Sequence, residues 1–268
     1  MLKDITLGQF FPGQSVVHRL DPRTKLVLTL VYIVALFTAA GCYSYGLMAA
    51  VLVCVIVLSQ IRLKTILKSM RPLVIIIVFT FVLNMFFTGG TRVLVSFWII
   101  RITLEGVVMA VKMIFRLVML IIGTFQLTYT TSPIALTDGM EKLMNPLKKI
   151  RVPVHELAMM MSIALRFIPT LIEETDKIIS AQKARGADFE SGNLIRRAKA
   201  MLPILVPLFI SAFRRADELA VAMESRCYHG GEGRTRMKRL RMKGSDIAAF
   251  LMGAAVLAAV IVLSMFGL

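Results

Sequence analysis

The strongest constraint on this chain is a series of apolar stretches, each close to the length that a lipid bilayer demands. They cover residues 26–40, 47–61, 73–87, 107–127 and 247–268. A spanning helix needs about 20 mostly apolar residues, so the shorter stretches should extend into their flanks. Because 57% of the residues are hydrophobic, more than a soluble core buries, much of the surface must face lipid. The sequence therefore predicts an all-α polytopic membrane protein with about five transmembrane helices.

The lysines and arginines indicate how these helices are oriented. Basic residues precede the first apolar stretch and follow the second, whereas the turn at 41–46 has none. Since cytoplasmic loops carry the excess of Lys and Arg, we expect a multi-pass protein of the cell membrane with a cytoplasmic N-terminus. Alternation then places residues 129–245 in the cytoplasm, with 20 of the 32 basic residues, and Leu268 outside. The stretch 93–100 is too short to cross the membrane by itself, and we expect an interfacial or re-entrant piece there.

Three parts follow from this pattern: an N-terminal transmembrane domain at 1–128, a cytoplasmic domain at 129–245 and a C-terminal transmembrane helix at 246–268. In the cytoplasmic part, apolar residues recur every three and four positions over 154–185 and again over 193–226. This period predicts two long amphipathic helices. Pro203 and Pro207 should bend the second one. Each helix is apolar over one end and charged toward the other, so both need a partner surface.

No catalytic or metal-binding constellation is recognisable in the sequence. A phosphate-binding G-x-x-x-x-G-K-[ST] motif is missing, so we do not expect this chain to hydrolyse ATP by itself. His155 and Glu156 begin like a zinc-protease motif, but Met159 stands where the second histidine should be. The histidines have no ligand spacing, and three adjacent methionines at 159–161 point in different directions on a helix. We expect a non-enzymatic protein with no metal, no cofactor and no nucleic-acid partner.

One short pattern occurs twice. Each long helix ends in a small residue followed by an arginine, in Ala184-Arg185-Gly186 and in Ser225-Arg226-Cys227. A cation in a last helical turn can simply satisfy the helix dipole and the unpaired carbonyls, which is sufficient for either arginine alone. The repetition favours a second interpretation. Small neighbours let a partner approach closely, and the planar guanidinium suits a groove that carries carboxylates.

Together with residues 12–15, 18–25, 146–175, 181–192 and 213–233, these motifs give the chain a specific resemblance to a known family. It resembles the transmembrane T component (EcfT) of energy-coupling factor (ECF) transporters, which are ABC importers for vitamins and trace nutrients. The resemblance implies a cytoplasmic coupling domain whose two long helices cross, and whose A-R-G-like motifs seat in grooves of two ATPase subunits. Ala184-Arg185-Gly186 matches that motif fully, whereas Ser225 and Cys227 replace its alanine and glycine.

The implied function is that of a scaffold subunit, which transmits ATP-driven motion to a substrate-binding membrane (S) subunit. The surface that meets this S subunit should be apolar and built from adaptable side chains. The candidate residues are Met159, Met160, Met161, Ile163, Met201, Leu205 and Phe209. In the alternative interpretation, the methionines only pack the core of their own domain.

Charged residues beside these apolar faces lead to a further hypothesis. An ion-pair network that fixes the helix crossing could join Arg166 to a cluster on the second helix, formed by Arg214, Arg215, Asp217 and Glu218. Solvated pairs within one helix are the simpler alternative. A second class of protein also stays open, namely a membrane-anchored structural or lipid-binding protein whose basic segment 234–243 meets anionic headgroups. A channel is disfavoured, because Lys112 and Arg116 lie inside a span without an acidic partner there.

Overall fold

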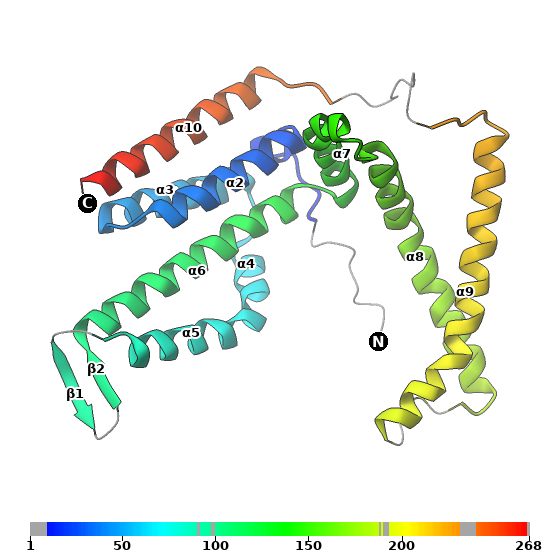
Figure 1. Ribbon diagram of the computed structural model, residues 1–268, viewed down its shortest axis with the longest axis horizontal. Coiled ribbons are helices and arrows are strands. Elements are labelled where there is room, and N and C mark those ends of the chain that lie inside the picture. The colour runs from blue at the N-terminus through cyan, green and yellow to red at the C-terminus, as the bar shows by residue number, and fades with distance from the viewer. Residues whose placement is uncertain are drawn as a thin grey trace. The chain divides into compact units, whose positions relative to one another are not determined.

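The computed structural model describes residues 10–89, 92–97, 100–187, 189, 193–230 and 240–266 (Figure 1). Helices dominate, and the predicted all-α class is confirmed. The α-helices are α1 (Val16–Arg19), α2 (Pro22–Thr38), α3 (Cys42–Ser59), α4 (Leu63–Met70), α5 (Val74–Phe87), α6 (Leu104–Thr130), α7 (Pro133–Met144), α8 (Val154–Ala184), α9 (Leu194–Glu224) and α10 (Gly244–Met265). Two 3₁₀ helices, η1 (Arg71–Leu73) and η2 (Asn145–Ile150), and two short strands, β1 (Val93–Phe97) and β2 (Ile100–Thr103), complete the described elements.

Five helical segments are long and apolar enough to cross a membrane: α3, the segment Leu63–Phe87 with α4 and α5, α6, α8 and α10. Four of them coincide with predicted stretches. The remaining predicted stretch, 26–40, corresponds to α2, whose 17 residues measure about 26 Å at 1.5 Å per residue. α8 lies in the part that the charge pattern assigns to the cytoplasm, and it is the least apolar of the five segments.

The chain divides into two compact units. The transmembrane unit comprises Gly8–Gly139 and Leu240–Leu268, and the paired-helix unit comprises Met140–Arg239. The chain therefore leaves the transmembrane unit within α7 and returns to it shortly before α10. The sequence pattern suggested the changes of domain at 128/129 and at 245/246.

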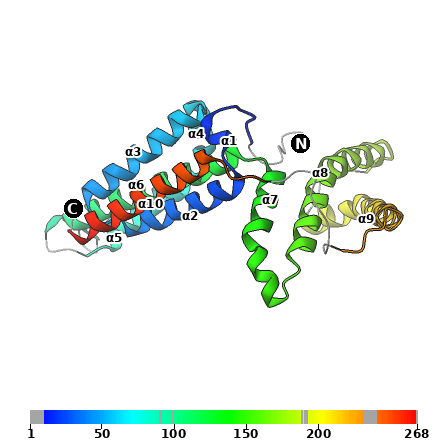
Figure 2. The same cartoon turned by 90° about the horizontal axis from the view of Figure 1, so that it is seen from above.

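In the transmembrane unit, α2 packs against α3, α6 and α10, α3 also packs against α6 and α10, and α5 packs on α6 (Figures 1 and 2). Their buried core consists of Ala35, Leu36, Ala39, Met48, Leu52, Met119 and Val260. Small residues permit close approach, as at Gly123 of α6, where a Cβ would collide with the ring of Tyr32. The Tyr32 hydroxyl in turn donates to the Met119 carbonyl at 3.1 Å. Close packing and a shared hydrogen bond thus join α2 to α6.

The two cations inside α6 have carbonyl partners. Arg116 Nη2 donates to the carbonyl of Ala39 at 3.0 Å, and Lys112 Nζ donates to the carbonyl of Ala40 at 3.5 Å. These carbonyls lie at the C-terminal end of α2, where the last C=O groups have no intrahelical donor. The Arg116 guanidinium also lies 5.7 Å from the ring centroids of Phe37 and Tyr45. Both cations therefore cap a helix end, a role that needs no acidic partner.

The stretch 93–100, expected to be an interfacial or re-entrant piece, lies in an antiparallel β-hairpin. Val95 stands opposite Ile102 and Phe97 opposite Ile100, while residues 98–99 are outside the described part. Thr103 then caps the start of α6, because its Oγ1 accepts from the Gly106 N–H at 3.1 Å and donates to the Thr88 carbonyl at 3.1 Å. The hairpin thus joins the end of α5 to the start of α6.

In the paired-helix unit, α8 and α9 pack against each other (Figure 1). The two prolines predicted to bend α9 lie inside that helix, and Pro169 lies inside α8. A proline cannot donate to the carbonyl four residues earlier, so Pro207 leaves the carbonyl of Pro203 without its helical donor. Gln182 Nε2 of α8 donates to that carbonyl at 3.4 Å. Pro207 of α9 thus leaves a carbonyl available to accept a hydrogen bond from α8.

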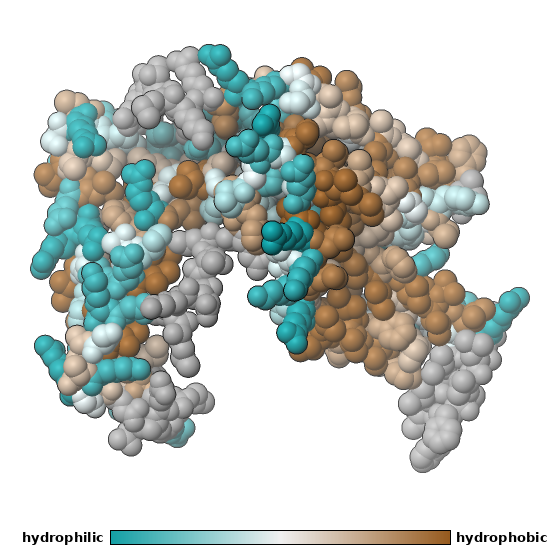
Figure 3. All heavy atoms as spheres, turned by 180° about the vertical axis from the view of Figure 1, so that it is seen from behind, coloured by the Kyte–Doolittle hydropathy of each residue, from teal (hydrophilic) through white to brown (hydrophobic). Residues whose placement is uncertain are grey.

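The two units differ in surface character. On the face shown in Figure 3, hydrophobic residues cover the helices of the transmembrane unit almost continuously, whereas hydrophilic residues are interspersed over the paired-helix unit. In α5, for example, Ile75 is 76% exposed and Phe87 is 83% exposed. Such side chains are stable on a surface that faces lipid.

Candidate functional site

Main-chain hydrogen bonds close the end of α8 at the first arginine motif. The N–H of Gly186 donates to the carbonyl of Lys183 at 3.0 Å, and the N–H of Ala187 donates to the carbonyl of Gln182 at 3.0 Å. Gly186 has a φ of +86°, a left-handed conformation that glycine adopts without a steric penalty. This pattern is a Schellman motif with Arg185 at the C-cap.

α9 ends in the same way at the second motif, although the residues differ. The N–H of Cys227 donates to the carbonyl of Glu224 at 2.9 Å, and the N–H of Tyr228 donates to the carbonyl of Met223 at 3.0 Å. Cys227 has a φ of +55° and so occupies the position that Gly186 has in the first motif. A residue other than glycine costs about 1–2 kcal/mol in this conformation. The second motif thus keeps the cap despite its unfavourable residue.

These caps bear on the simpler interpretation of the two arginines. The carbonyls near each helix end already accept main-chain N–H groups, so they do not require a guanidinium. Both arginine side chains are exposed, and neither has a hydrogen-bond or ion-pair partner within the part of the chain that the structure describes. Arg185 and Arg226 are therefore available to another molecule.

The contacts between α8 and α9 define an antiparallel register. Near the end of α8, Gln182 contacts Pro203, and two turns earlier Glu174 contacts Arg215. Arg185 closely follows Gln182, whereas Arg226 follows Pro203 by 23 residues, about 35 Å of helix at 1.5 Å per residue. The two motifs therefore lie at opposite ends of the helix pair.

The residues predicted to contact a substrate-binding subunit are apolar and mostly exposed, but the antiparallel register places residues 159–161 and Met201 at opposite ends of the helix pair. Met160, Met161, Met201, Leu205 and Phe209 are between 46% and 59% exposed, while Met159 and Ile163 are half-buried. On α9 the exposed apolar residues also include Leu202 and Val206, inside the range 201–209 indicated by the sequence, and continue beyond it over Ile210 and Phe213. The rings of Phe209 and Phe213 stack with their centroids 6.3 Å apart. The same spacing of three and four residues extends through these positions, so the sequence already contained the signal for them.

One ion pair joins the two helices in the described residues. Arg215 Nη2 lies 3.0 Å from Glu174 Oε2, and the Ser211 hydroxyl hydrogen-bonds to the same carboxylate. Arg215 belongs to the predicted cluster, but Glu174 was not singled out from the sequence. Arg166, Arg214, Asp217 and Glu218 are exposed. The network proposed for these four residues stays a prediction.

The other residues considered for chemistry have structural partners. His155, in the first turn of α8, places Nδ1 3.1 Å from Glu141 Oε1 of α7. Within the described residues, no group of three or more His, Cys, Asp or Glu side chains is arranged to hold a metal ion.

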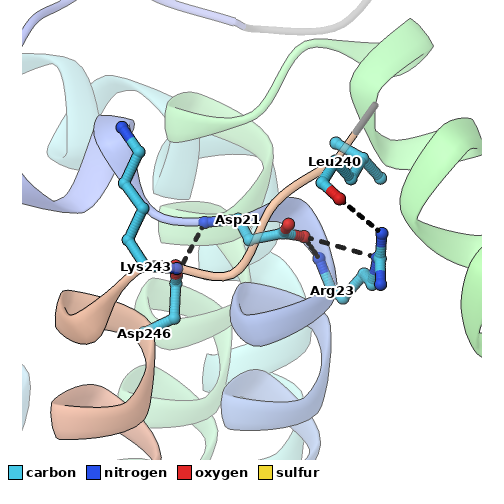
Figure 4. A network of polar contacts seen from close by, with 5 residues as sticks. All are labelled: Asp21, Arg23, Leu240, Lys243 and Asp246. Atoms are coloured by element: carbon cyan, nitrogen blue, oxygen red, sulfur yellow. Dashed lines mark hydrogen bonds and ion pairs between the residues drawn. The ribbon is translucent and has the colours of Figure 1, made fainter. Parts of the chain in front are cut away.

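A polar cluster that the sequence reasoning missed lies where α2 and α10 begin (Figure 4). The Asp246 carboxylate accepts hydrogen bonds from the N–H of Asp21 at 2.8 Å and from the N–H of Lys243 at 2.7 Å. Arg23 Nη2 donates to the carbonyl of Leu240 at 3.3 Å. The stretch 18–25 contributed to the family resemblance, but nothing in its residue types identified partners more than 200 positions away.

The fold and this site define a class: a polytopic helical membrane protein with a second unit that presents two exposed arginines at opposite helix ends. Comparison with known proteins shows which family the chain belongs to. The model of the CbiQ family, described as cobalt transport protein, matches residues 13–237. The chain is 58% identical over 250 residues to the energy-coupling factor transporter transmembrane protein EcfT of Thermosediminibacter oceani, covering 93% of this chain and 94% of the relative.

Two further relatives carry the same name. The EcfT protein of Ruminiclostridium cellulolyticum is 55% identical over 247 residues, which is 92% of each chain. That of Bacillus subtilis is 47% identical over 251 residues, covering 94% of this chain and 95% of the relative. The chain therefore belongs to the family of transmembrane T components of ECF transporters, which confirms the resemblance seen in the sequence. Membership of this family makes it a membrane component of a transporter with other subunits.

Proposed function

We propose that this chain is the scaffold subunit of an ECF-type ABC importer, which transmits ATP-driven motion from two ATPase subunits to a substrate-binding membrane subunit. The imported substrate class would be a vitamin or a trace nutrient. One observation carries the proposal: two exposed arginines occupy the same C-cap position at opposite ends of a packed helix pair. Two equivalent contacts on two ATPase subunits need such an arrangement.

Arg185 and Arg226 would be the residues that contact the ATPases. An arginine offers five donors in a planar fork, which matches a carboxylate better than a lysine does. Each arginine follows a helix of 31 residues, and a helix passes on a displacement with less loss than a loop. When the ATPases close on ATP, the two contacts would move relative to each other and shift α8 against α9.

The exposed apolar residues of α8 and of α9 would then pass this shift to the substrate-binding subunit. Flexible methionines such as Met160, Met161 and Met201 adapt to different partner shapes, which suits partners that exchange. The exposed rings of Phe209 and Phe213 add a large apolar contact area.

This proposal places the paired-helix unit, and the N-terminus, on the cytoplasmic side. α8 is apolar enough to span, but it has basic residues at both ends, with Lys148, Lys149 and Arg151 before it and Lys183 and Arg185 at its end. Because basic residues stay on the cytoplasmic side, an orientation along the membrane surface fits them better than a crossing.

The native cysteines test this orientation. Cys42, Cys54 and Cys227 are all exposed, and variants that retain only Cys42 or only Cys227 can be made with serine at the other two positions. In intact cells, a membrane-impermeant maleimide should label the Cys42 variant and should not label the Cys227 variant until the membrane is permeabilised. Labelling of Cys227 in intact cells would refute the orientation.

Copurification tests the function. After gentle solubilisation, native mass spectrometry should find the chain with two ATP-binding subunits and one small membrane protein. If the chain copurified with no ATPase, the scaffold proposal would be wrong, and a membrane-anchored structural protein would be the better description.

A further inference from the structure

Both places where the chain leaves and re-enters the transmembrane unit lie against the start of α2. At the exit, Gly139 of α7 packs on Pro22 so closely that a Cβ there would lie 3.0 Å from the Pro22 Cβ. At the return, the carbonyl of Leu240 accepts the hydrogen bond from Arg23. Two neighbouring residues of the N-terminal part thus contact both connections to the paired-helix unit, and all these contacts lie within the transmembrane unit itself.

Buried carboxylates fix this start of α2. Asp21 is 6% exposed, and its Oδ1 accepts from the N–H of Arg23 at 2.9 Å and lies 3.7 Å from the Arg23 Nε. Asp246 is 1% exposed and accepts both the N–H of Asp21 and the N–H of Lys243, so it ties the start of α10 to the start of α2 (Figure 4). A negative charge at a helix N-terminus is favourable, and a buried carboxylate is stable only when it is hydrogen-bonded in this way.

Lys25 extends the cluster to the helix that precedes the exit. It is 5% exposed, and its Nζ donates to the carbonyl of Thr130 at 2.8 Å and to the carbonyl of His18 at 3.2 Å. Thr130 is the last residue of α6, where carbonyls have no helical donor. Residues 21–25 therefore hold the end of α6, the exit at α7, the return at Leu240 and the start of α10.

We propose that residues 21–25 are the anchor through which movement of the paired-helix unit enters the transmembrane unit, with Arg23 as the positioning residue on the return connection. The inference rests on the proposed function. Within the part of the chain that the structure describes, α8 and α9 are joined to the membrane helices through α7 and through the segment before α10, so a displacement can reach them along either connection. Because the anchor holds both connections, it converts movement of either one into movement of α2, α6 and α10 together.

The test uses the complete complex with its ATPases and substrate-binding subunit, reconstituted in liposomes. A fluorophore on Cys42 reports on the transmembrane unit at the far end of α2, with the other thiols removed by Cys54→Ser and by Cys227→Gly, which gives the second motif the residue that the first has at this position. Phosphate release reports on the ATPases. In Arg23→Gln, ATP hydrolysis and copurification should persist, while the ATP-induced fluorescence change should fall by about five-fold or more, the low end of measured couplings between sites.

Three further variants separate positioning from simple stability. Arg19→Gln removes an exposed arginine of the same segment and should leave the fluorescence change intact. Arg23→Lys keeps one donor for the Leu240 carbonyl and should restore part of the change. Gly139→Ala leaves all charges in place but adds a Cβ that would lie 3.0 Å from the Pro22 Cβ, at the exit through α7. It should also reduce the ATP-induced fluorescence change.

The possible outcomes are distinct. The anchor is refuted if Arg23→Gln responds to ATP like the unmodified complex, and equally if it loses hydrolysis and copurification together with the response. An unmodified complex that neither contains ATPases nor responds to ATP would refute the proposed function itself, and the anchor with it.

Discussion

The ends of α2 and α6 in the transmembrane unit and the ends of α8 and α9 in the paired-helix unit are satisfied by different means. In the transmembrane unit, side chains from other elements cap the carbonyls: Arg116 reaches Ala39 at the end of α2, and Lys25 reaches Thr130 at the end of α6. In the paired-helix unit, α8 and α9 cap themselves through main-chain N–H groups. Arg116 and Lys25 are thus bound at helix ends, whereas Arg185 and Arg226 are exposed at theirs.

This difference separates a structural arginine from an available one. In lipid no water can satisfy an orphan carbonyl, so a distant cation that does so is part of the fold. Where a Schellman motif has already satisfied the carbonyls, an arginine at the C-cap contributes little to the helix beyond its interaction with the dipole. Arg116 and Arg226 carry the same guanidinium group. That of Arg116 donates to the Ala39 carbonyl, whereas that of Arg226 has no partner among the described residues and is available to another molecule.

The largest effect is expected from truncating the exposed arginines Arg185 and Arg226, which should weaken binding of the ATPases. Arg185→Ala or Arg226→Ala should each weaken ATPase association by about 2–5 kcal/mol, roughly 30-fold to several thousand-fold, because a carboxylate in the partner's groove loses its cation. Lysine should rescue poorly, since it keeps the charge without the fork. Titration of the purified chain with its ATPases measures the effect.

Lys199→Ala is the control, because Lys199 is an exposed cation inside α9, away from its end and outside the predicted network. The double variant Arg185→Ala/Arg226→Ala should insert into the membrane normally and abolish uptake. Normal assembly and uptake in this double variant would show that the two arginines do not couple the subunits.

The second-largest effect is expected at Arg116, the arginine bound inside the transmembrane unit, and it concerns the free energy of unfolding. Arg116→Met removes the donor to Ala39 and both aromatic contacts, so the free energy of unfolding should fall by about 1–3 kcal/mol. Arg19→Met, at an exposed arginine of α1, should change it by less than about 0.5 kcal/mol. Unfolding in mixed detergent micelles compares the two. Equal effects would mean that the cap at α2 is not structural.

Local patterns in the sequence were sufficient to predict most helices. The predicted ranges 154–185 and 193–226 agree with α8 and α9 within two residues, because apolar periodicity and a C′ glycine are properties of neighbouring residues. The apolar surface of α9 was predicted for the same reason. The identity of the family likewise followed from continuous motifs.

Contacts between distant parts of the chain could not be predicted in this way. The carbonyl partners of Lys112 and Arg116 are main-chain atoms of another helix, which no residue type reveals. Asp21 and Asp246 are separated by 225 positions, and their relation depends on how α10 packs on α2. The cap at Cys227 also contradicts its local preference, since cysteine rarely adopts a positive φ.

The two self-capped ends should respond oppositely to exchange of their C′ residues. Cys227→Gly removes the strain at φ +55° and should raise the free energy of unfolding by about 1 kcal/mol, whereas Gly186→Ala introduces it at φ +86° and should lower it by about the same amount. No heavy atom lies within 4 Å of a Cβ built on Gly186, so a loss of stability there would come from the backbone alone. Thermal unfolding of the two variants measures both changes. Changes of the same sign would contradict the equivalence of the two caps.

The smallest expected effect concerns the ion pair between α8 and α9. Arg215 and Glu174 have side chains 35% and 23% exposed, so solvent screens their attraction, and a double-mutant cycle should give a coupling of about 0.3–1 kcal/mol. The same cycle on Arg166 and Asp217, the pair suggested by the sequence, tests the wider network. Additive effects there would restrict ion pairing between α8 and α9 to Arg215 and Glu174, whose carboxylate also binds Ser211. A coupling at Arg166 and Asp217 equal to that at Glu174 and Arg215 would instead establish the network and make the α8–α9 crossing stiffer than one ion pair allows.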